Sequence, residues 1–308
     1  MNESKRSSLF LTGFLLSIGG AILFSTKAIW VKLAFRNTGV DALTLLSLRM
    51  LLALPFYLIA AWMAGKKELA TPLNKKDWSW IIALGVLGYY LSSLFDFIGL
   101  QYISAGLERL ILFLYPTFAV LLNTWIFKNK ISTIQLIALA ITYTGIGIAY
   151  YAELGTIQQN EQFYFGSFMV FSCAVTYSFY LVGTGKMVVK AGATRYTAYA
   201  MLAATAGVFI HFIVQAQWEH VNMSPQLWWY GIALAIIATV IPSFMLSSGM
   251  KKIGSNNVSI ITSIGPVSTI IQASLFLNEP ILLEQIIGTM MVIIGVVLIG
   301  WQTTRPIN

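Results

Sequence analysis

The chain has 308 residues, of which 57% are hydrophobic and 10% are charged, whereas soluble domains carry about 25% charged residues. Its mean hydropathy of +0.77 likewise excludes a protein whose whole surface faces water. The net charge of +8 does not indicate nucleic-acid binding, because the basic residues lie singly or in pairs between apolar stretches. These values indicate an integral membrane protein.

Ten apolar segments follow one another along the chain, each close to the roughly 20 residues that a helix needs to cross a bilayer. In order they cover residues 9–30, 41–64, 78–102, 105–127, 132–151, 163–183, 194–214, 226–250, 258–276 and 282–301. Their length and uniform apolarity favour helices over the alternating strands of a membrane barrel. The predicted fold is all-α, a polytopic membrane protein with ten transmembrane helices.

Basic residues alternate between the two ends of these segments. Both termini and the second, fourth, sixth and eighth connections carry Lys or Arg, whereas the third, fifth, seventh and ninth carry none. The positive-inside rule then predicts a multi-pass protein of the bacterial inner membrane with both termini in the cytoplasm. The first connection, with Lys32 and Arg36, is the exception to this pattern.

The chain also repeats itself at an offset of 150 residues. The matching identities are Gly99 with Gly249, Ile103 with Ile253, Ile111 with Ile261, Pro116 with Pro266, Gln135 with Gln285 and Gly145 with Gly295. Earlier helices align at an offset nearer 153, so that residues 9–151 and 163–301 form two repeats of five helices. Because five crossings are an odd number, we expect the second repeat to be inverted. Inverted repeats are typical of alternating-access transporters, whose substrate site lies between the repeats.

The second repeat resembles the EamA family of the drug/metabolite transporter superfamily. The resemblance rests on Gly265-Pro266, Leu277-Asn278-Glu279-Pro280, Gln285, Gly288 and Gly295, and in the first repeat on Pro116, Gln135 and Gly145. It implies ten helices, no cofactor, and transport of amino acids or similar metabolites, most often outward. The first repeat has Asn129 and Lys130 where the family often has a Glu-Pro pair, so a role for Glu279 in both repeats does not follow.

One face of the third segment is polar. Tyr89, Ser92, Ser93 and Asp96 have the spacing of a single helix face. At the offset of the repeat, the eighth segment has a matching polar face with Thr239 and Ser243. Such a face avoids lipid, so it lines a cavity or forms a hydrogen-bonded seam between helices.

Two prolines lie in the middle of corresponding segments. Pro116 and Pro266 remove a backbone hydrogen bond and are expected to kink the fourth and ninth helices. Corresponding breaks in two repeats point to a transport site, with the prolines as candidate gates, although they could also serve packing alone. The residues in phase with them that we count as cavity candidates are Phe113, Asn123 and Ser263.

Ionisable residues within membrane helices are costly and usually face the protein interior. Arg49 lies deep in the second segment and needs a partner, for which Asp96 is the candidate, although the second and third helices need not touch there. Arg49 is therefore a candidate either for a structural ion pair or for a substrate contact. Arg109 points about 100° away from Glu108 and could bind a substrate carboxylate. Asp96 could bind a substrate ammonium or take up a proton. Lys27, near the end of the first segment, is expected to reach the headgroups.

These features predict a secondary transporter of small polar metabolites, most often amino acids or amino-acid-like solutes, that exports them by alternating access. An uptake or exchange carrier is the alternative, followed by a channel or scramblase, or a membrane enzyme. The expected partners are a small-molecule substrate and the lipid bilayer, and not nucleic acid. The chain has no Gly-Lys-Ser/Thr nucleotide loop, no catalytic set and no metal-ligand cluster in its sequence. We therefore expect no cofactor.

Overall fold

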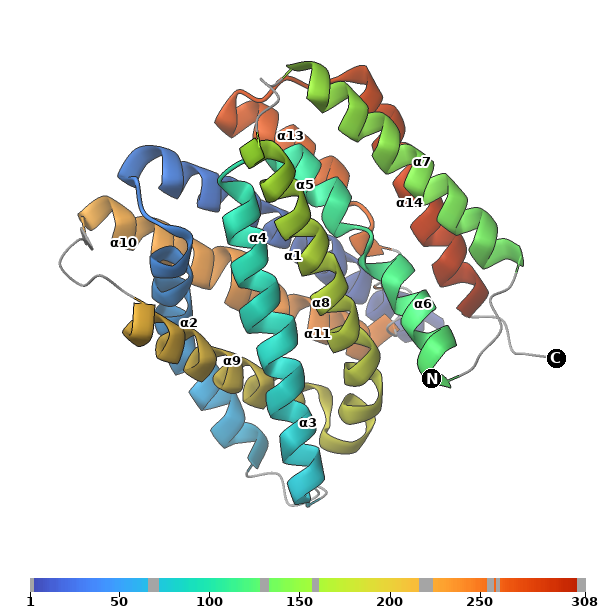
Figure 1. The fold of residues 1–308 in the computed structure, drawn as a ribbon. Helices are drawn as coiled ribbons and strands as arrows, with labels where there is room; N and C mark the ends of the chain where they lie inside the picture. The colour runs from blue at the N-terminus through green and yellow to red at the C-terminus, as the bar shows by residue number, and fades with distance from the viewer. Residues whose placement is uncertain are drawn as a thin grey trace.

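The computed structural model describes residues 3–65, 72–127, 133–156, 161–215, 224–253, 258 and 261–303. Within these ranges all regular structure is helical (Figure 1). The elements are α1 (Glu3–Thr38), α2 (Ala42–Gly65), α3 (Lys75–Gly85), η1 (Val86–Leu91), α4 (Ser92–Leu100), α5 (Ala105–Leu112), α6 (Tyr115–Phe127), α7 (Thr133–Thr156), α8 (Glu161–Ala191), α9 (Ala193–Gln215), α10 (Pro225–Ile232), η3 (Ala233–Val240), α11 (Ile241–Ile253), α13 (Gly265–Leu277) and α14 (Leu283–Thr303). Seven described helices are long and apolar enough to cross a membrane, and α13 and α14 are shorter apolar helices. The predicted all-helical membrane fold is confirmed.

The first helix is longer than its apolar run. Helix α1 continues past Trp30, where the predicted segment ends, to Thr38. Lys32 therefore lies within the helix and not in a connection, and its Nζ donates a hydrogen bond of 2.6 Å to the carbonyl oxygen of Ile103. Both charges of the exception in the charge pattern, Lys32 and Arg36, thus lie within α1, with Arg36 in its last turn.

The helices pack in two similar groups. Helix α1 lies against η3, α11 and α13, which together form the α1 group, and α8 lies against α3, η1, α4 and α6, which together form the α8 group. Helix α5 contacts both α8 and α13, so it stands between the groups. Helix α2 pairs with α9, and α7 pairs with α14 side by side at one edge of the molecule (Figure 1).

Irregular turns occur at matching places along the chain. The π-helices η1 and η3 interrupt α3–α4 and α10–α11, respectively. The fourth and ninth segments each break just before their proline. There Leu114 N donates to Ile111 O at 3.0 Å, and Ile264 N donates to Ile261 O at 3.3 Å, both over three residues. π-Turns and helix breaks of this kind are frequent at functional sites.

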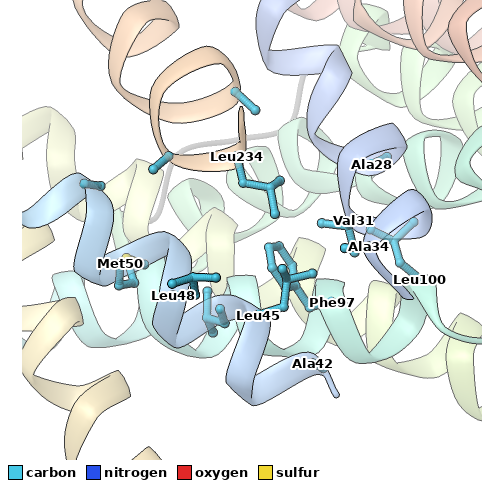
Figure 2. Close-up of a cluster of buried hydrophobic side chains, with 14 of the residues drawn as sticks. Ala28, Val31, Ala34, Ala42, Leu45, Leu48, Met50, Phe97, Leu100 and Leu234 are labelled. Atoms are coloured by element: carbon cyan, nitrogen blue, oxygen red, sulfur yellow. The ribbon is translucent and has the colours of Figure 1, made fainter. Parts of the chain in front are cut away.

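A buried apolar cluster fixes α1, α2, α4 and η3 against one another (Figure 2). Small residues such as Ala28 and Ala34 allow these helices to approach closely, and Phe97 fills the space between them. The neighbours of these residues in sequence are charged: Lys27 precedes Ala28, Arg49 lies between Leu48 and Met50, and Asp96 precedes Phe97. The cluster therefore positions three ionisable side chains from three helices.

Candidate functional site

A cavity of about 240 Å³ lies between the α1 group and the α8 group. Its wall is assembled from α1, α2, η1, α4, α5, the α5–α6 break, α6, α8, α11 and the start of α13. Charged and aromatic side chains alternate on this wall. Those that carry the argument below are Lys27, Arg49, Tyr89, Ser92, Ser93, Asp96, Arg109, Phe113, Tyr115, Cys173 and Tyr177.

Lys27 is the cation closest to Asp96. Its Nζ lies 2.6 Å from Asp96 Oδ2 and 3.8 Å from Glu108 Oε1. Both carboxylates are fully buried. The expectation that Lys27 reaches the headgroups is wrong, because α1 continues for three further turns and places this lysine in the interior. The sequence held a signal for this position, since the apolar pattern resumes after Lys32 with Leu33, Ala34 and Phe35.

The side chains of Arg109 and Glu108, which are adjacent in α5 and start in different directions from the helix, approach each other. Arg109 Nε lies 3.9 Å from Glu108 Oε2 and donates to Thr269 Oγ1 on α13 at 3.1 Å. A second guanidinium nitrogen donates to the Phe24 carbonyl oxygen at 3.4 Å. Two basic residues, Lys27 and Arg109, thus lie beside two acidic residues, Asp96 and Glu108, and the formal charges of the four sum to zero.

Arg49 has a different environment. Its side chain is 4% exposed, and its Nε donates to Thr239 Oγ1 at 3.0 Å. Its Nη1 lies 3.5 Å from Ser93 Oγ, and its guanidinium carbon lies 5.5 Å from the centre of the Phe97 ring. In the described ranges, no carboxylate lies within ion-pair distance of Arg49. The expected pairing of Arg49 with Asp96 is therefore wrong, because Lys27 occupies that carboxylate.

Among the other predicted site residues, Tyr89, Ser92, Ser93 and Phe113 line the cavity, whereas Thr239, Ser243 and Ser263 do not, and Ser243 lines a separate small cavity. Tyr89, Ser92 and Ser93 lie with Asp96 on the cavity wall, as does Phe113 in the α5–α6 break. Thr239 reaches the site through Arg49, and Ser243 Oγ donates to the Thr239 carbonyl oxygen at 2.6 Å. Ser263 is buried in the break before α13. The side chain of Asn123 lies outside the described residues.

The two prolines begin helices and do not lie within them. Pro116 is the second residue of α6 and Pro266 the second residue of α13, where a missing N–H has no helical partner to lose. The breaks before them are adjacent to the cavity, because Phe113 and Gly265 both line it. Ser25 Oγ donates to the Gly265 carbonyl oxygen at 3.1 Å and so ties α13 to α1 at this point.

Sequence reasoning also missed Cys173 and Tyr177 of α8, which form part of the cavity wall. Cys173 was indistinguishable from a small packing residue, since a single thiol in an apolar run carries no pattern. The ring centroids of Tyr177 and Tyr115 lie 5.2 Å apart, and the two rings are nearly perpendicular to each other. Such a contact between helices is not readable from the chain.

Several known proteins are similar to this chain. The model of the EamA-like transporter family matches residues 11–151 and again 164–301. An uncharacterised transporter of Bacillus subtilis, YcbK, is 34% identical over 278 residues, covering 87% of this chain and 86% of that protein. A second from the same organism, YyaM, is 28% identical over 228 residues, or 73% of each chain. One solved structure, titled only as the crystal structure of a protein, shares the fold with a TM-score of 0.67 at 18% identity, covering 97% of this chain and 99% of that one. The chain belongs to the EamA-like transporter family.

Proposed function

We propose that the protein is a secondary transporter of amino acids or amino-acid-like solutes, that it exports them across the bacterial inner membrane, and that it works by alternating access. The two five-helix repeats, residues 9–151 and 163–301, would move relative to each other around the central cavity. At about 240 Å³ the cavity is smaller than the pockets that hold drug-sized ligands, which suits a small metabolite.

The observation that carries this proposal is the buried Arg49. Lys27 and Arg109 are balanced by Asp96 and Glu108, so Arg49 is the cation of the wall that no carboxylate among the described residues balances. A buried charge is stable only with a counter-charge or strong hydrogen bonds. A substrate carboxylate would supply the counter-charge, and the planar guanidinium suits it.

Asp96 is the candidate that would bind the ammonium group of such a solute. Its carboxylate lines the cavity, contacts Lys27 through Oδ2 and lies next to the carboxyl group of Glu108. An ammonium group entering the cavity would find an acceptor there. This arrangement revises the roles inferred from sequence, because Arg49 replaces Arg109 as the candidate for the carboxylate, and Arg109 is engaged by Thr269 and Glu108.

The test is counterflow into proteoliposomes with labelled amino acids and with the corresponding amino-acid amides, which lack the carboxylate. We expect saturable, trans-stimulated uptake, and Arg49→Gln should raise the KM of the carboxylate solute by about tenfold with little effect on the amide. Arg36→Gln, at an exposed arginine on α1, is the matched control and should change neither.

The outcomes separate the alternatives. Uptake without trans-stimulation would indicate a channel or scramblase. Trans-stimulated uptake in which Arg49→Gln affects acid and amide equally would refute the role of Arg49 while leaving a carrier. Net movement of a preloaded solute out of intact cells, faster in cells that contain the protein than in cells that lack it, tests the outward direction against uptake or exchange.

A further inference from the structure

A second group of charged residues lies close to Glu108 but does not line the cavity. It surrounds the turn between α4 and α5. Glu279, from the connection between α13 and α14, accepts from the backbone N–H groups of Ala105 and Gly106 at the start of α5, at 3.1 and 3.4 Å. The residues that hold this turn are Lys32, Glu153, Glu279 and Gln285, which we call the clasp.

The contacts of the clasp with the turn join parts of the chain that belong to different packing units, whereas the bond between Glu153 and Gln285 lies within the α7–α14 pair. Lys32 on α1 donates to Ile103 O, directly after α4, and lies 3.8 Å from Glu279 Oε1. Glu153 on α7 accepts from Ser104 N at 3.3 Å, and its other oxygen accepts from Gln285 Nε2 on α14 at 2.9 Å. The clasp therefore ties the α1 group and the α7–α14 pair to the turn.

The turn itself is fixed to α8 by close backbone contact. A Cβ atom added to Gly166 of α8 would lie 2.7 Å from Tyr102 Cβ and 3.1 Å from the Gly99 carbonyl oxygen. Any movement of the α8 group must then carry the turn with it. Because the bonds of the clasp cross from this turn to α1 and to the α13–α14 connection, they cannot persist when the two groups separate at this end.

We propose that the clasp is the outer gate of the transporter, that its bonds hold the periplasmic end closed, and that they must break for the cavity to open outward. The side follows from the proposed topology, in which Lys32 and the α13–α14 connection face the periplasm. The proposal also rests on the alternating-access function above.

The first repeat lacks the glutamate on which the clasp depends. At the repeat offset, the position equivalent to Glu279 is Asn129, which cannot offer a carboxylate to helix N–H groups and a lysine together. Residues 128–132 lie outside the described ranges. The ion pair near the opposite end, Lys190 Nζ to Asp77 Oδ2 at 2.6 Å, joins α8 to α3, which both belong to the α8 group, so it need not break. Among the described residues, bonds that must break on opening are therefore found at the outer end, and the ion pair at the opposite end is not one of them.

The single native cysteine gives a direct measurement. Cys173 lines the cavity and is otherwise buried, so a membrane-impermeant maleimide added to intact cells reaches it only through an open outer end. Glu279→Gln keeps the shape of the side chain but weakens its bonds to Lys32 and α5. We expect Glu279→Gln to be labelled about tenfold faster than the wild type, because loss of the clasp shifts the population toward the outward-open state.

Three variants complete the experiment. Lys32→Gln breaks another arm and should act in the same direction, which keeps the test decisive where Glu279→Gln does not fold. Glu284→Gln, at an exposed carboxylate in the first turn of α14, is the matched control and should label like the wild type. Cys173→Ala should abolish labelling and so assigns the signal.

Equal labelling rates for Glu279→Gln, Lys32→Gln and Glu284→Gln would overturn the gate. Faster labelling of the variants only in inside-out vesicles would place the clasp on the cytoplasmic side and overturn the outer assignment. Because the readout needs no substrate, a failed counterflow experiment with intact clasp effects would refute the proposed function and not the gate.

Discussion

Lys27 on α1 and Asp96 on α4 form an ion pair of 2.6 Å at the wall of the cavity, and this pair links the α1 group to the α8 group. The same ammonium lies 3.8 Å from Glu108 Oε1. One lysine thus serves two fully buried carboxylates.

Removal of Lys27 is expected to lower the stability of the folded protein substantially. Lys27→Met would leave Asp96 and Glu108 with Arg109 alone, and breaking a buried ion pair from one side costs about 3–5 kcal/mol. We expect a large fall in the midpoint of thermal unfolding in detergent, partly reversed in the double variant with Asp96→Asn. Lys190→Met is the matched control, because its pair with Asp77 has the same length but is more exposed, and such pairs contribute about 0–1 kcal/mol. Similar midpoints for the two lysine variants would show that Lys27 does not stabilise the buried carboxylates.

The identity of the ten segments was accessible from sequence, because the bilayer imposes length and apolarity on every crossing. The end of α1 was not, since Lys32 and Arg36 resemble the charges of a connection although the helix continues to Thr38. Lys32 is accommodated by the Ile103 carbonyl and by Glu279. These contacts involve residues that are distant in the sequence, so the residues around Lys32 do not predict them.

In the candidate site, too, the charged residues could be predicted from the sequence, whereas their partners could not. The cost of charge in lipid made Asp96, Arg49 and Arg109 conspicuous, and the three lie on one cavity wall. Their partners could not be predicted, because pairing depends on which helices touch. The sequence predicts that Lys27 reaches the headgroups and that Asp96 pairs with Arg49. Both predictions are wrong, because α1 packs against α4 and α5 and places Lys27 beside Asp96 and Glu108.

The proline breaks are expected to matter for movement more than for folding. Pro116→Ala and Pro266→Ala restore an N–H group, which can close the break and make the fourth or ninth helix continuous. We expect counterflow to slow several-fold more than the yield of folded protein falls. Pro55→Ala is the matched control, since Pro55 lies exposed inside α2 and has no counterpart in the second repeat. If transport and folded yield decline in parallel for Pro116→Ala and Pro266→Ala, these prolines serve packing alone.

Close packing of α7 against α14 depends on glycine. A Cβ atom on Gly145 would lie 2.6 Å from the Gly288 carbonyl oxygen and 2.7 Å from Met291 Cβ, so Gly145→Ala should push the two helices apart. We expect a lower thermal midpoint in detergent. Gly147→Ala is the matched control on the same helix, because a Cβ there meets no atom within 4 Å, and alanine in place of glycine favours a helix by roughly 0.5–1 kcal/mol. Equal midpoints for both variants would contradict the close α7–α14 contact.

The orientation in the membrane decides which side the clasp faces, and it can be tested in the Cys173→Ala background. A cysteine in place of Gln158, in the fifth connection and outside the described residues, should react with an impermeant maleimide added to intact cells. A cysteine in place of Lys76, an exposed residue in the first turn of α3, should react only after the membrane is opened. The reason is the distribution of charge: residues 66–76, which run from the second connection into the first turn of α3, include Lys66, Lys67, Lys75 and Lys76, whereas the fifth connection has no basic residue. The reverse labelling pattern would put both termini in the periplasm and would turn the clasp into a cytoplasmic gate.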